Sequence, residues 1–120
     1  MGAFKDLLEK QDIIILDGAL GTELERQGYD VSGRLWSAKY LLENPQIIQG
    51  LHEDYVRAGS DIITTSSYQA SIPTFVEEGL SLDKAYELFK ETVLLAQAAI
   101  KNVWQGLSLD EQKKRSYPLI

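Results

Sequence analysis

The hydrophobic residues of this chain fall into short continuous runs and longer stretches with helical spacing. Apolar and β-branched runs occupy residues 13–16, 61–65 and 117–120, and the first two read as strands buried on both faces. Between the runs, apolar positions recur every three or four residues, as in helices that cover a sheet. After an opening helix, the pattern therefore predicts the order β–α–α–β–α–β, with parallel strands and an α/β fold.

Local signals mark where the predicted helices begin and end. Asn44 and Pro45 are an N-cap and a first-turn proline, and Gly59 ends that helix. Ser81 caps a long helix. The stripe of that helix predicted to face inward is Leu82, Ala85, Tyr86, Phe89, Val93, Ala96, Ile100 and Val103.

Composition narrows the classes of function. The net charge is −6, which leaves no basic stripe for nucleic acid, and the one basic cluster, residues 113–115, is interpreted as a solvated connection. No apolar run approaches the roughly 18 residues of a membrane span, and the first residues lack the pattern of a secretory signal. Cysteine is absent, so the chain supplies no thiolate to a metal; a cytoplasmic location is expected.

The segment Asp17-Gly18-Ala19-Leu20-Gly21-Thr22-Glu23 carries the most chemical information. It follows the first apolar run, where a carboxylate and exposed backbone N–H groups come together at the end of a strand. Such a place can hold both ends of an amino acid, because the carboxylate faces its ammonium and the amides face its carboxyl group. Carboxyl ends of strands are also where α/β enzymes keep their active sites.

This segment is the first of several that resemble the homocysteine S-methyltransferases. The others are Leu35-Trp36-Ser37-Ala38-Lys39, Asn44-Pro45, Leu51-His52, Arg57-Ala58-Gly59-Ser60-Asp61-Ile62-Ile63 and Thr65-Ser66-Ser67-Tyr68-Gln69-Ala70-Ser71. They cover most of residues 14–71 in order. Two of them, residues 35–39 and 68–70, look most like the branch that uses S-methylmethionine or S-adenosylmethionine.

The resemblance implies a (β/α)8 TIM barrel in which zinc, held by three cysteines, binds homocysteine as a thiolate that attacks a sulfonium methyl and yields methionine. Residues 1–120 are then expected to be the N-terminal part of the homocysteine-binding barrel domain, with the cysteine ligands beyond residue 120. Three strands cannot close a barrel of eight. The chain alone is therefore expected to be inactive, to hold no metal and to self-associate through open sheet edges.

The resemblance also suggests which residues form the substrate site. Asp17 would bind the homocysteine amino group, with a helix N-cap or turn carboxylate as the alternative. The backbone of Gly18, Ala19 and Leu20 would bind the substrate carboxylate. Trp36 would face the methyl donor, although a place in the core stays open. The residues expected to line the barrel mouth, unless they form a plain polar loop, are Thr65, Ser66, Ser67, Tyr68 and Gln69.

Three other interpretations are weighed against this one. His52 is the only histidine, and a structural or solvent-facing role is favoured over metal binding. A barrel of another chemistry would use the glycine-rich loop for phosphate, but Asp17 would repel that anion and no Walker-type Gly-Lys-Ser/Thr is present. A non-catalytic α/β interaction fragment is the third alternative.

Overall fold

The computed structural model describes residues 2–33, 38–67 and 70–120. Helices dominate these ranges, and within them backbone pairing between extended segments is limited to isolated bridges. The helices are α1 (Gly2–Lys10), α2 (Leu20–Arg26), α3 (Lys39–Glu43), α4 (Pro45–Ala58), α5 (Ile72–Glu77), α6 (Leu82–Gly106) and α7 (Leu109–Lys113).

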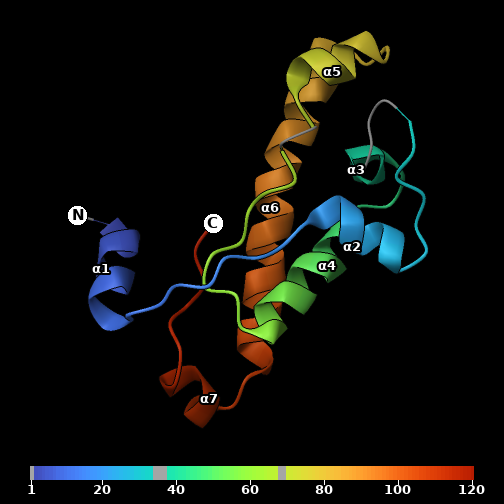
Figure 1. The fold of residues 1–120 in the computed structure, drawn as a ribbon. Coiled ribbons are helices and arrows are strands. Elements are labelled where there is room, and N and C mark those ends of the chain that lie inside the picture. Colours follow the sequence, from blue (N-terminus) through green and yellow to red (C-terminus); the bar gives the residue numbers. More distant parts are fainter. Residues whose placement is uncertain (1, 34–37, 68–69) are drawn as a thin grey trace.

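A helical layer forms the core of the molecule. Figure 1 shows α4 packed along the long α6, with α2 and α3 beside α4 and α5 against the start of α6. The predicted helix boundaries hold: Pro45 opens α4, Gly59 closes it with φ of 114°, and Ser81 Oγ accepts a hydrogen bond from the Lys84 N–H at 3.2 Å. Asn44 occupies the N-cap position of α4 as predicted, but its side chain makes no cap hydrogen bond.

The packed face of α6 is rotated from the predicted stripe. Ala85, Ala96, Ile100 and Val103 are buried as expected, but Tyr86 is 50% exposed. Leu82, Phe89 and Val93 are likewise exposed, and the buried positions include instead Leu88, Thr92, Leu95 and Ala99. Helix α6 carries apolar residues on adjoining flanks, and the direction from which α4 and α5 approach decides which flank is covered.

Three extended segments cross one side of this layer. Leu16 bridges Ile62 and Ile62 bridges Leu119, both in parallel, so the predicted parallel order is confirmed. The Asp17 N–H donates to Ile62 O at 3.1 Å, and the Leu119 N–H donates to Asp61 O at 2.8 Å. In the described ranges these contacts remain single bridges, and continuous strands at 13–16, 61–65 and 117–120 are not formed.

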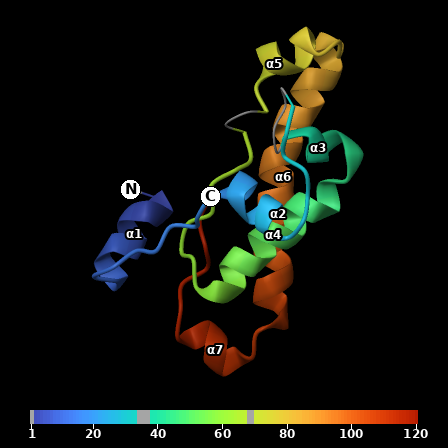
Figure 2. The same cartoon turned by 45° about the vertical axis from the view of Figure 1, so that its right-hand side comes forward.

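The prediction that residues 13–16 are buried on both faces is also wrong. Ile13 is 76% exposed and Leu16 62% exposed, whereas Ile63 in the central segment is fully buried. The helices cover one side of the extended segments, and the described residues supply no layer for the other side. Helix α1 stands apart from the helical layer in both views (Figure 1, Figure 2).

The dimensions agree with this open arrangement. The radius of gyration is 15.5 Å, against about 13.6 Å for a compact domain of this length. No helix in the described ranges is both long and apolar enough to cross a membrane.

Candidate functional site

Asp17 lies where the first extended segment ends. Its backbone N–H is paired with Ile62, and its Oδ2 accepts a hydrogen bond from the Thr64 N–H at 3.0 Å. This bond orients the carboxylate at the carboxyl end of the central segment. The N-cap alternative is wrong, because Ala19, two residues later, occupies the N-cap position of α2.

The loop after Asp17 rests against α4. A Cβ atom on Gly18 would lie 2.8 Å from Tyr55 Oη, so only glycine fits there without displacing the tyrosine. The same hydroxyl donates to Ala19 O at 2.8 Å. Within the described ranges, the N–H groups of Gly18, Ala19 and Leu20 have no hydrogen-bond acceptor, as an anion-binding loop requires.

Thr65 and Ser66 continue from the residue that holds Asp17. Thr65 Oγ1 and Ser67 Oγ are 2.7 Å apart and share a hydrogen bond. Ser66 is buried, and its hydroxyl has no partner among the described residues. Thr65 and Ser66 therefore lie directly after Thr64, the hydrogen-bond partner of Asp17, at the carboxyl end of the central segment. Trp36, Tyr68 and Gln69 lie outside the described residues.

His52 is buried on α4, which agrees with the structural role expected for it and excludes the solvent-facing alternative. It is 1% exposed, and neither ring nitrogen has a partner in the parts of the chain that the structure describes. Burial lowers the pKa of His52, and the nearby charge of Asp17 opposes that shift. A low pKa favours the neutral imidazole. The described residues contain no group of three or more potential metal ligands.

The opposite ends of the extended segments hold a polar contact that the sequence did not predict. Asp61 is 6% exposed, and its Oδ2 accepts from the Ile15 N–H at 2.9 Å and from Gln11 Nε2 at 3.1 Å. A buried carboxylate is stable only with such donors. Asp61 therefore fastens the segment that carries Asp17 to the central one.

The interpretation of residues 113–115 as a solvated connection holds for Lys113 and Lys114, which are exposed as expected, but Arg115 is not solvated in this way. Its guanidinium donates to Val56 O at 2.9 Å and to Ser60 O at 3.0 Å, so it satisfies carbonyls at the end of α4.

Helix α7, which ends just before Arg115, was also not predicted from the sequence. Ser108 and Glu111 form a capping box at its start, a spacing that is visible in the sequence.

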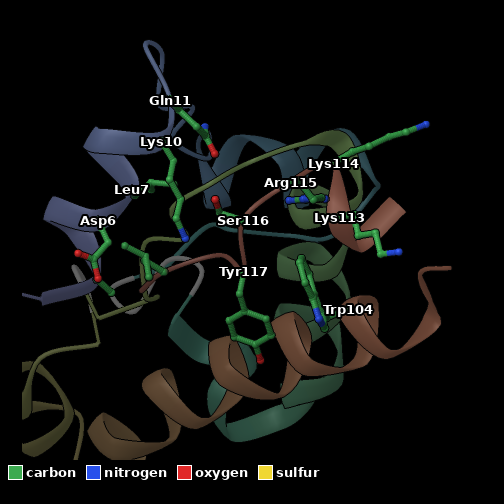
Figure 3. Close-up of a pocket in the computed structure, with 12 residues that line it drawn as sticks. Asp6, Leu7, Lys10, Gln11, Trp104, Lys113, Lys114, Arg115, Ser116 and Tyr117 are labelled. Carbon is green, nitrogen blue, oxygen red and sulfur yellow. The ribbon is translucent and has the colours of Figure 1, made fainter. Parts of the chain in front are cut away.

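A cavity of about 700 Å³ lies at the amino ends of the extended segments, away from Asp17. Figure 3 shows Lys10, Trp104, Arg115 and Tyr117 on its wall. Trp104 and Tyr117 meet edge to face with ring centroids 5.1 Å apart, and Arg115 is engaged by α4. The ring contact joins the end of α6 to the third extended segment, and the Arg115 bonds join the residue before that segment to the end of α4, so these parts of the cavity wall are explained by packing.

Comparison with known proteins settles the family. The model of the family described as homocysteine S-methyltransferase matches residues 14–114. The chain belongs to the homocysteine S-methyltransferase family. It is 47% identical to the homocysteine S-methyltransferase of Escherichia coli over 93 residues, which are 78% of this chain and 30% of that protein. It is 42% identical to a selenocysteine Se-methyltransferase of Brassica oleracea over 93% of this chain and 33% of that protein.

Solved structures give the same result. The oxidized form of homocysteine methyltransferase MmuM from E. coli matches with a TM-score of 0.82 and 40% identity, over 98% of this chain and 38% of that one. The metallated form of MmuM matches equally well. The chain thus spans about a third of the length of the relatives it matches.

Proposed function

We propose that this chain forms the amino-acid-binding wall of a methyltransferase that moves a methyl group from a sulfonium donor, S-methylmethionine or S-adenosylmethionine, to homocysteine, giving methionine. The observation that carries the proposal is the orientation of Asp17. One carboxylate oxygen is held by the Thr64 N–H at 3.0 Å, which leaves the other oxygen for a substrate ammonium. The N–H groups of residues 18–20 would then bind the substrate carboxylate.

Asp17 and its loop recognise what all α-amino acids share. Homocysteine and selenocysteine, the acceptors in the names of the relatives, both carry an ammonium and a carboxylate. The wall in this chain therefore fixes the backbone end of the acceptor. We propose that the choice between acceptor side chains depends on residues outside the described ones. Trp36, which also lies outside them, is proposed to contact the donor.

The zinc ion that the family resemblance implies does not fit the residues of this chain. The sequence has no cysteine, and the described residues contain no cluster of three potential ligands. We propose that the ligands belong to the part of the barrel domain that the 120 residues do not include. The chain alone is accordingly proposed to be inactive. Separately, we propose a cytoplasmic location for the protein.

Exposed apolar side chains support the proposal that the isolated chain self-associates. Ile13, Ile15 and Leu16 are each more than half exposed beside a backbone edge that carries only single bridges. Such an edge can pair with a second chain. Sedimentation velocity should show oligomers that grow with concentration, and a monodisperse monomer across the range would contradict this.

A chimera tests the proposed function. Residues 1–120 replace the matching segment of MmuM, which the chain covers with a TM-score of 0.82, and methionine formation from homocysteine and S-methylmethionine is measured. The chimera should be active and the 120-residue chain inactive. A folded, metal-loaded chimera without activity, beside an active MmuM treated in the same way, would refute the proposal.

A further inference from the structure

Tyr55 reaches from α4 to the loop that follows Asp17, and it touches two consecutive residues there. Its hydroxyl donates to Ala19 O at 2.8 Å. A Cβ atom placed on Gly18 would meet Tyr55 Oη at 2.8 Å, Cε1 at 3.2 Å and Cζ at 3.3 Å. One side chain therefore both fixes a carbonyl of the loop and sets how closely its backbone approaches α4.

From this contact we infer that Tyr55 is a positioning residue for amino-acid binding, acting through the peptide group between Ala19 and Leu20. This inference rests on the proposed function. The carbonyl of Ala19 and the N–H of Leu20 belong to one planar peptide unit and point in opposite directions. Holding the carbonyl toward Tyr55 aims the Leu20 N–H away from α4. The bond also polarises the peptide and makes that N–H a better donor.

The rest of α4 keeps Tyr55 in place. Its neighbours Leu51 and Val56 are buried, and Tyr55 itself packs against both apolar clusters of the core. Its own carbonyl accepts from the Ser60 N–H at 3.1 Å where the helix ends. The hydroxyl is thus carried by a rigid element, as precise positioning requires.

The hydroxyl also stays protonated at neutral pH. Partial burial raises the pKa of Tyr55 above its usual value, and the charges of Glu23 and Asp17 raise it further. Tyr55 therefore remains a hydrogen-bond donor to Ala19 O over the working range of an enzyme at neutral pH.

The experiment removes only the hydroxyl. Tyr55→Phe in the chimera should raise the KM for homocysteine about two- to tenfold, the value of one neutral hydrogen bond, with kcat and the donor KM unchanged. Tyr86→Phe is the matched control, because that tyrosine is exposed on α6; it should change none of the three. An unchanged homocysteine KM in Tyr55→Phe, or a loss confined to kcat, would overturn the inference.

A second substitution separates positioning from general packing. Gly18→Ala should weaken homocysteine binding, and it should do so less when Tyr55→Phe has removed the nearest colliding atom. Strictly additive effects would contradict the coupling.

The contact is also tested in the 120-residue chain, independently of catalysis. The ¹³C carbonyl resonance of Ala19 should shift in Tyr55→Phe and stay in Tyr86→Phe, and an unmoved Ala19 signal would overturn the inference. If the unmutated chimera is inactive, the proposed function fails. The Ala19 signal and the Gly18–Tyr55 coupling in unfolding free energy then decide whether Tyr55 holds the loop.

Discussion

The helical layer and the extended segments of this molecule contain similar residues in opposite surroundings. Ile48 on α4 and Leu24 on α2 are fully buried, whereas Ile13 and Leu16 are 76% and 62% exposed. Helices satisfy their own backbone hydrogen bonds and need only one packed face. Parallel strands need neighbours on both edges and layers on both faces. Here the central segment is bridged on both edges, but the helices cover only one side of the three segments.

This difference separates stability from function. The apolar clusters that hold the chain together lie between α4, α6 and the shorter helices. Asp17 and Thr64, by contrast, sit at the ends of the segments with the weakest pairing. The candidate site therefore depends on a few polar contacts, from Thr64, Tyr55 and Asp61, more than on apolar packing around it.

The largest expected effect is on the free energy of unfolding, when isoleucine is replaced by alanine in each of the two regions. Ile48→Ala should lower the free energy of unfolding of the chain by about 2–5 kcal/mol, because it leaves a cavity in the core. Ile13→Ala should change it by less than about 0.5 kcal/mol, since that side chain is already in water. Urea unfolding followed by circular dichroism measures both. Equal losses would show that the extended segments are as well packed as the helices.

The next effect concerns the polar contact between the extended segments. Asp61→Ala leaves the Ile15 N–H without its partner and should cost about 1–3 kcal/mol. Asp61→Asn keeps an oxygen acceptor at the same position and should cost less. Urea unfolding of the two variants checks the order. A result in which alanine and asparagine cost the same would mean that the side-chain oxygen does not fasten these segments.

The smallest effect is a pH dependence carried by His52. Burial lowers its folded-state pKa below the ordinary value of 6.5, so the unfolded chain binds the proton more tightly. Stability from this residue is therefore complete above pH 6.5 and is lost as the pH falls toward the folded pKa, by at most about 1.4 kcal/mol per pH unit. The negative charge of Asp17 favours protonated His52 and so reduces this loss of stability.

Unfolding free energies between pH 7.5 and pH 5 measure this slope. His52→Leu should flatten it, because the chain contains no second histidine. A slope that persists in the leucine variant would assign it to other groups.

The sequence predicted the helical layer better than the segments that carry the site. Proline and glycine mark both ends of α4, and Ser81 starts α6, because helix boundaries depend on neighbouring residues. The face of α6 was predicted less well, since its apolar residues extend over two flanks and long-range packing selects one. A hydrogen bond between residues far apart in the chain, such as that from Arg115 to the end of α4, has no local sequence pattern that could predict it.

For the candidate site, the sequence indicated Asp17 and its loop but not what holds them. The bond from the Thr64 N–H and the contact of Tyr55 with Gly18 join residues far apart in the chain. Tyr55 in particular has the spacing of a core residue on α4, and only the structure shows its hydroxyl at Ala19. The family resemblance supplied the functional interpretation of Asp17; the geometry supplies its supports.

The most direct test of the account is the dissociation constant of homocysteine in the chimera with and without the Asp17 charge. Asp17→Asn removes a charge-assisted hydrogen bond of about 1.5–3 kcal/mol, so the constant should rise about tenfold to hundredfold. Asp12→Asn, the same change at an exposed position, should leave it unaltered, and donor binding should be unaffected in both. An unchanged homocysteine constant in a folded, metal-loaded Asp17→Asn chimera would contradict the account and reduce Asp17 to a structural turn residue.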